Sequence, residues 1–158
     1  MEIKDLPSTS GYDEWLKAED LPVISGFFIA DINTIELAPW QRKGVLGAYI
    51  RLQGTEDWTG AYVCEIPPGQ QTKPQRHLFE EMIFILKGSG ATTVWEEGGQ
   101  PQTFEWQKGS LFAIPLNAHH QHFNGAAGEP PLAFFVFERI LRHDVGINIY
   151  NNPHGLLL

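Results

Sequence analysis

The chain has 158 residues, 42% of them hydrophobic and 12% aromatic, which is enough to build the core of one domain. Its formal net charge of −8 argues against a nucleic-acid partner, because phosphate backbones need clustered Lys and Arg. The single cysteine excludes an internal disulfide, and no apolar run reaches membrane-spanning length. We therefore expect a soluble, cytoplasmic protein that does not contact a membrane.

The predicted elements begin with one short helix and continue almost entirely as strands. After a leader at residues 1–10, the helix is expected from Glu14 to Glu19, ending before Pro22. Segments rich in β-branched and aromatic residues predict strands at 24–32, 45–53, 59–67, 81–88, 91–97, 102–106, 110–115, 120–124 and 132–140. Regularly spaced strands without helices between them indicate an antiparallel sandwich or barrel.

The expected organisation is a leader with a short helix (1–22), one all-β domain (23–150) and a C-terminal tail (151–158). The tail ends on three leucines, which could pack on the barrel or on a second subunit. The same ending would also suit a chain that is shorter than its relatives. The sequence leaves these alternatives open.

A group of polar residues precedes the apolar segment that starts at Met82. If residues 75–86 form one strand, side-chain alternation places Gln75, His77 and Glu81 on the same face. Both faces are apolar beyond Met82, which is typical of a strand covered on both sides. A carboxylate facing an apolar interior is costly unless it is paired or binds a cation. These three residues are therefore candidate metal ligands, and the alternative is a polar strand edge without metal.

A second polar group contains three histidines in the segment that ends near Gly125. Strand alternation places His120, His122 and Asn124 on one face, with His119 on the other. Alternation alone does not decide which face is turned inward.

The two groups resemble the paired motifs of the cupin superfamily. The first motif, G-x5-H-x-H-x3,4-E-x6-G, is matched by Gly69, Gln75, His77, Glu81 and Gly88, with Gln75 in place of the first histidine. The second motif, G-x5-P-x-G-x2-H-x3-N, is matched by Gly109, Pro115, Asn117, His120 and Asn124, with Asn117 in place of the second glycine. Asn tolerates the left-handed conformation of a turn glycine, so the second replacement is structurally mild.

The resemblance implies an all-β cupin jelly-roll barrel (a double-stranded β-helix), either a single barrel or one half of a two-barrel protein. It also implies a divalent transition metal held by His77, Glu81 and His120, with Gln75 at the fourth position as a ligand or as a hydrogen-bond partner. His120 would then face inward together with His122. An ordinary histidine pKa near neutrality would suit His122 as an acid–base group beside the metal, and the alternative is a structural histidine.

The function that the resemblance favours is a metal-dependent enzyme acting on a small organic molecule, foremost a dioxygenase-type oxidoreductase with Fe(II). In that reaction His122 or Arg76 would assist proton or charge movement. The same ligands would also serve Zn, Mn or Ni, and Zn or Mn would suit an isomerase, lyase or hydrolase instead. The replacement of the first histidine by Gln75 favours the alternative of a non-catalytic small-molecule-binding or sensor cupin. A homodimer, formed through the edge of strand 24–32, is also expected.

Overall fold

The structure is a computed structural model that describes residues 11–54, 59–125 and 132–139. The expected leader at 1–10, the tail at 151–158 and Trp58 lie outside these residues. The described chain begins with the helix α1, Gly11–Glu19, and contains a 3₁₀ turn, η2, at Ile32–Thr34. No helix among the described residues is both long enough and apolar enough to cross a membrane.

The described strands number ten and follow one another with short connections. Their bounds are β1 Val23–Gly26, β2 Ala38–Trp40, β3 Val45–Leu52, β4 Thr59–Ile66, β5 Glu81–Lys87, β6 Ser89–Trp95, β7 Gln102–Gln107, β8 Leu111–Ile114, β9 His119–Phe123 and β10 Leu132–Arg139. The all-β expectation is confirmed, and the helix before the strands is one turn longer than the sequence predicted.

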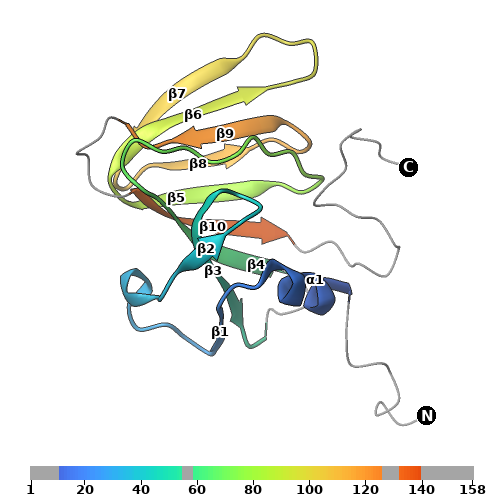
Figure 1. The fold of residues 1–158 in the computed structure, drawn as a ribbon, viewed down its shortest axis with the longest axis vertical. Helices are drawn as coiled ribbons and strands as arrows, with labels where there is room; N and C mark the ends of the chain where they lie inside the picture. Colours follow the sequence, from blue (N-terminus) through green and yellow to red (C-terminus); the bar gives the residue numbers. More distant parts are fainter. Residues whose placement is uncertain (1–10, 55–58, 126–131, 140–158) are drawn as a thin grey trace.

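The strands form two sheets that face each other (Figure 1). The larger sheet has the order β1-β3-β4-β10-β5-β8, with β2 paired to β3, and the smaller one has the order β7-β6-β9. Every named pair is antiparallel except β1 with β3. The segment that leads into β5 runs beside β9, where isolated bridges join Gln71 to Phe123 and Gln75 to His120. This segment therefore links strand β9 of the small sheet to strand β5 of the large one.

The core fills the space between the sheets. On β4, the even-numbered side chains Tyr62, Cys64 and Ile66 point into the main core cluster, together with Ile83 and Ile85 of β5. Ala61 and Val63 belong to a second cluster with Ile50, covered by the isoleucines of the segment between β1 and β2. Burial of apolar side chains on both faces of β4 holds this strand firmly in place.

Two expectations about the strands are wrong. The first strand ends at Gly26 instead of extending to residue 32, and Phe27 and Phe28 after it are 81% and 77% exposed. Asp31 instead caps the 3₁₀ turn, its carboxylate accepting the backbone N–H of Asn33. Strand β5 is not covered on both sides, because Met82 and Phe84 are 48% and 41% exposed.

Candidate metal centre

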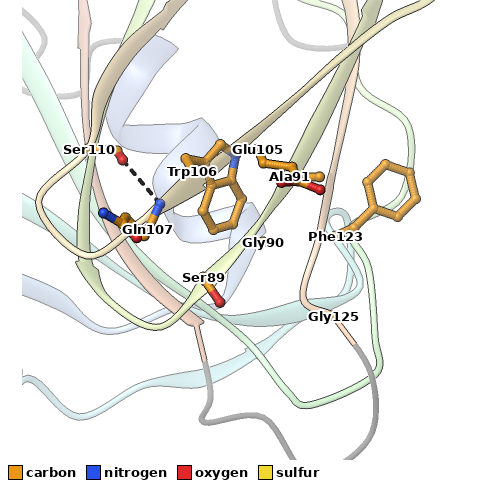
Figure 2. A pocket seen from close by; sticks show the side chains of 9 residues that line it. All are labelled: Ser89, Gly90, Ala91, Glu105, Trp106, Gln107, Ser110, Phe123 and Gly125. Carbon is orange, nitrogen blue, oxygen red and sulfur yellow. Dashed lines mark hydrogen bonds between the residues drawn. The ribbon is translucent and has the colours of Figure 1, made fainter.

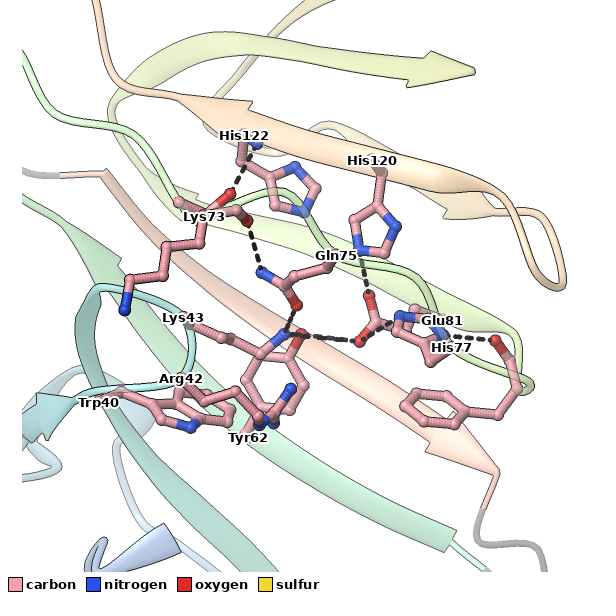
Figure 3. A network of polar contacts seen from close by, with 12 residues as sticks. Trp40, Arg42, Lys43, Tyr62, Lys73, Gln75, His77, Glu81, His120 and His122 are labelled. Carbon is pink, nitrogen blue, oxygen red and sulfur yellow. Dashed lines mark hydrogen bonds and ion pairs between the residues drawn. The ribbon is translucent and has the colours of Figure 1, made fainter. Parts of the chain in front are cut away.

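The candidate ligands come from three separate parts of the fold (Figure 3). Glu81 is the first residue of β5, and His120 lies on β9, where its side chain is fully buried. Gln75 is placed by its backbone, whose N–H and C=O both bond to the backbone of His120 at 2.9 Å. Residues 76–80 are not a strand, so a bend, and not strand alternation, brings His77 beside Glu81.

His77, Glu81 and His120 converge in the barrel interior. One ligand atom from each lies within 4.8 Å of the other two, and all three residues are buried. His77 Nε2 is 3.3 Å from Oε1 of Glu81, and His120 Nε2 is 3.7 Å from Oε2. The sequence-predicted set is therefore brought together, although His77 reaches it from a loop.

The hydrogen bonds of the two imidazoles orient their lone pairs toward the carboxylate. Nδ1 of His77 lies 2.9 Å from the carbonyl of Phe79, and Nδ1 of His120 lies 3.2 Å from the carbonyl of Ala118. A carbonyl only accepts, so Nδ1 carries the proton and Nε2 of the neutral ring carries a lone pair.

The three atoms that face one another are therefore all electron-pair donors. Both Nε2 atoms and Oε2 of Glu81 have no hydrogen-bond partner among the residues that the structure describes. Buried polar atoms without partners are costly, and a divalent cation would satisfy all three. Imidazole nitrogen and carboxylate oxygen are ligands that Fe(II), Zn, Mn and Ni accept, so the donor set fits a metal ion.

The second oxygen of Glu81 is already bonded to the protein. The hydroxyl of Tyr62, on β4, donates to Oε1 at 2.8 Å, and the Lys43 ammonium lies 3.9 Å from the same oxygen. Burial alone would raise the pKa of the Glu81 carboxyl, but positive charge on His77, when its ring is protonated, and on the Lys43 ammonium holds that pKa well below its ordinary value in the metal-free protein. Glu81 is therefore an ionised carboxylate, with Oε2 facing His120 and Oε1 facing His77.

Lys43 also lies at the candidate centre, although the sequence did not predict it as a site residue. It lies in the turn between β2 and β3, yet it is buried, with its ammonium 4.4 Å from the Tyr62 ring and 4.9 Å from the Trp40 ring. Nζ donates to the Tyr62 hydroxyl at 2.8 Å and to Oε1 of Gln75 at 2.5 Å. A lysine in a short polar turn has the pattern of a surface residue, so only the fold reveals this position.

His122 lies beside the centre but is held by other contacts. It is buried, its ring centre is 5.4 Å from that of His120, and its Nδ1 is 2.8 Å from the hydroxyl of Thr92. The indole N–H of Trp106 donates to the same hydroxyl at 2.7 Å. Burial lowers the pKa of His122 to about 3, far below the ordinary histidine value expected from the sequence, so the ring does not exchange its proton near neutral pH as an acid–base group would.

Other residues of the motifs stabilise the surroundings of the centre. Asn117 has a φ of 62°, so it adopts the left-handed turn conformation expected of the glycine it replaces. Its backbone and side-chain oxygens accept from Nε of Arg76 at 3.0 Å. Arg76 therefore stabilises this turn. His119 is turned away from the interior and stacks on Trp95.

A pocket of about 630 Å³ opens elsewhere, between β6, β7 and the residues just after β9 (Figure 2). Its lining includes Ser89, Glu105, Trp106, Ser110 and Phe123, and none of the candidate ligands. The candidate metal centre is therefore formed by buried side chains that do not line this pocket. The buried thiol of Cys64 is no alternative nucleophile, because burial raises its pKa to about 12.

Solved structures share this fold at low sequence identity. The polyketide cyclase RemF from Streptomyces resistomycificus aligns with a TM-score of 0.59 and 20% identity, over 73% of this chain and 80% of that one. The cupin domain of Schizosaccharomyces pombe Cnp3 aligns with a TM-score of 0.56 and 19% identity, over 70% and 72% of the two chains. An oxalate decarboxylase from Lactobacillus farciminis aligns with a TM-score of 0.57 and 22% identity, over 70% of this chain and 33% of that one. These likenesses show the cupin fold and nothing about the reaction.

Sequence relatives are more specific. Auxin-binding protein 4 of Zea mays is 28% identical over 129 residues, which are 70% of this chain and 62% of the relative. Auxin-binding protein 1 of Arabidopsis thaliana is 33% identical over 84 residues, 45% of this chain and 42% of the relative. The chain thus spans about three fifths or less of the length of these two relatives. The auxin-binding protein family matches residues 45–154, which include all the candidate ligands. The chain belongs to the auxin-binding protein family, and it has the cupin fold.

Proposed function

We propose that this protein is a metal-dependent cupin that binds a small organic molecule at the centre formed by His77, Glu81 and His120. The observation that carries the proposal is the convergence of three buried donor atoms without hydrogen-bond partners among the described residues. Three protein ligands leave coordination positions to which a ligand can bind. The metal would supply Lewis acidity and fix the orientation of the bound molecule.

The charges around the centre favour an anionic ligand. The Lys43 ammonium lies 3.9 Å from Glu81 and offsets its charge, so a divalent ion would leave the buried centre with a net positive charge. An organic carboxylate would neutralise that charge in a low-dielectric interior. Relatives named auxin-binding proteins support a small-molecule ligand, and we extend that property to this chain as part of the proposal.

Metal analysis with a matched pair of histidine variants tests this function. The wild-type protein is expected to hold about one transition-metal ion per chain after reconstitution, and the metal identity follows from the same measurement. His120→Ala should lose the ion, while His119→Ala, on the opposite face of β9, should keep it. Binding of small organic acids, measured by calorimetry on the metal-loaded and metal-free proteins, should require the metal. Metal retained by His120→Ala would contradict the ligand set.

Dioxygenase activity is the second candidate, and the composition of the centre favours it. Two histidines and one carboxylate are the residues that hold non-haem Fe(II) in many oxygenases, and iron would supply the redox chemistry. His77, Glu81 and His120 would hold the ion. Oxygen uptake by iron-loaded protein with a panel of organic acids tests this candidate. Tight binding of an organic acid without oxygen uptake would refute dioxygenase activity and would still support the binding function.

A homodimer is proposed through the edge of the large sheet. Strand β1 is the terminal strand of that sheet, and the exposed Phe27 and Phe28 follow it directly. Apolar side chains beside a strand edge that has no partner among the described residues favour association with a second copy. Light scattering should report a dimer for the wild-type protein and a monomer for a variant with Phe27→Ser and Phe28→Ser.

A further inference from the structure

The side chain of Gln75 occupies the position where the motif has a first histidine, but it is directed at Lys43. Its Oε1 accepts from the Lys43 ammonium at 2.5 Å, whereas its Nε2 is 3.5 Å from the carbonyl of Lys73 (Figure 3). A metal would need the oxygen, because an amide nitrogen carries no available lone pair. The oxygen that could serve as a ligand is therefore held by the Lys43 ammonium.

The ammonium that holds this oxygen is itself firmly placed. Gly44 N–H donates to the carbonyl of Trp40 at 2.7 Å, which closes the turn, and Lys73 bonds to both ends of it. The Lys73 N–H donates to the carbonyl of Lys43 at 2.8 Å, and its ammonium donates to the carbonyl of Gln41 at 2.7 Å. The rings of Trp40 and Tyr62 cover the charge. Lys43 cannot turn to solvent without breaking these contacts.

We infer that Lys43 is a positioning residue that keeps Gln75 off the metal, so that the ion has three protein ligands instead of four. This inference rests on the metal centre proposed above. Hydrogen bonds to a charged donor are stronger than neutral ones, so the pair of Lys43 and Gln75 resists exchange for a weak amide–metal bond. Lys43 also repels a divalent ion directly, because its charge lies 3.9 Å from Glu81.

Cobalt substitution gives a readout that does not depend on activity. The d–d absorption of bound Co(II) changes with the number and type of its ligands. Gln75→Leu is expected to leave the wild-type spectrum unchanged, and Gln71→Leu, exposed on the same segment, is the matched control. Lys43→Met is expected to change the spectrum because the freed amide can reach the ion. It should also tighten Co(II) binding about tenfold or more through loss of the repelling charge.

The double variant Lys43→Met/Gln75→Leu identifies the group responsible. It should return the spectrum to the wild-type form, because the amide is absent while the three other ligands remain. A changed spectrum in Gln75→Leu alone would show that Gln75 is a ligand and overturn the inference. The test with Gln75→Leu can be made even if Lys43→Met does not fold.

Cobalt uptake distinguishes failure of the proposed metal centre from failure of the proposed role of Lys43. If wild-type protein and Gln75→Leu both take up no Co(II), the metal centre itself is wrong, and the inference falls with it. Wild-type protein could instead take up Co(II) and have the same Co(II) spectrum and Co(II) affinity as Lys43→Met. That result would support the metal centre and refute the role of Lys43.

Discussion

The hydroxyl of Tyr62 donates a 2.8 Å hydrogen bond to Oε1 of Glu81, so one carboxylate oxygen is fixed by the protein, while Oε2 faces His120 and has no hydrogen-bond partner among the described residues. Because the same hydroxyl accepts from Lys43, a single side chain orients both charges of the centre. Groups that orient a metal ligand affect metal affinity even when they do not touch the metal.

Tyr62→Phe should therefore weaken metal binding without removing it. The expected loss is about 10–100-fold in affinity, as for other residues that orient a ligand. The unfolding free energy should fall by about 1–3 kcal/mol, because two buried charged groups lose a hydrogen-bond partner. Tyr49→Phe is the control, since its buried hydroxyl lies 3.4 Å from Arg42 and outside the centre. Chelator competition and urea unfolding measure the two effects, and equal results for both variants would contradict this role of Tyr62.

Glu81→Gln should abolish metal binding and destabilise the protein. The change removes the carboxylate beside the buried Lys43 ammonium, and breaking a buried pair in this way costs about 3–5 kcal/mol. Glu80→Gln, exposed at the neighbouring position, should have almost no effect on either property. Thermal unfolding and metal analysis of both variants test this pair. A Glu81→Gln protein as stable as the wild type would show that Lys43 does not depend on the carboxylate.

The stability of the metal-free protein should fall as the pH falls below about 6.5. Burial lowers the pKa of His122 from 6.5 to about 3 and lowers that of His120 well below its ordinary value. Between the folded and unfolded values the unfolded chain binds more protons, so acid favours unfolding. Each histidine contributes a slope of up to about 1.4 kcal/mol per pH unit.

Glu81 acts in the same direction at lower pH. Its folded pKa is well below 4.5, so its contribution is present above 4.5 and is lost as the pH falls further. Urea unfolding from pH 7 to pH 4 measures the slope, and His122→Gln should reduce it by about one proton. A slope of zero between pH 6.5 and pH 5 would contradict the burial of neutral histidines.

Gly90→Ala should destabilise the contact between β6, β7 and β9. A Cβ at this position would lie 2.2 Å from the carbonyl oxygen of Phe123 and 2.4 Å from the Trp106 ring. Relieving such an overlap requires backbone movement and costs about 1–3 kcal/mol or more. Gly99→Ala is the control, because its nearest atom would be 3.3 Å away in an exposed turn. Comparable melting temperatures for the two variants would mean that the strands near Gly90 can move apart.

The sequence was a good guide wherever a local pattern carried the information. Alternation along His119–Phe123 defined the two faces of the strand, and the motif resemblance chose the face that the structure turns inward. The position of Asn117 in a left-handed turn also followed from residue chemistry. Strand alternation was less useful before Glu81. Residues 76–80 do not form a strand, so a bend in the chain, and not alternation, places His77 at the centre.

Lys43 could not be predicted, because its burial depends on contacts far away in the sequence. Its turn is stabilised by Lys73, and its ammonium reaches Gln75 only after β3, β4 and the segment before β5 have assembled. The short strand β2, which contains Pro39, was missed for the same reason, since its pairing with β3 and not its composition defines it. Contacts of this kind are tertiary and leave no periodic signal.

The backbone pair between Gln75 and His120 would also couple a bound ion to local opening of the barrel. Thr72 N–H bonds to the carbonyl of His122 and Asn124 N–H to the carbonyl of Gln70, so one ladder joins the segment before β5 to β9. Any fluctuation that separates this ladder would move His120 relative to Glu81 and would release a metal bound between them. Bound metal should therefore slow amide hydrogen exchange along β9 in proportion to its occupancy, while strands of the opposite sheet edge exchange as before.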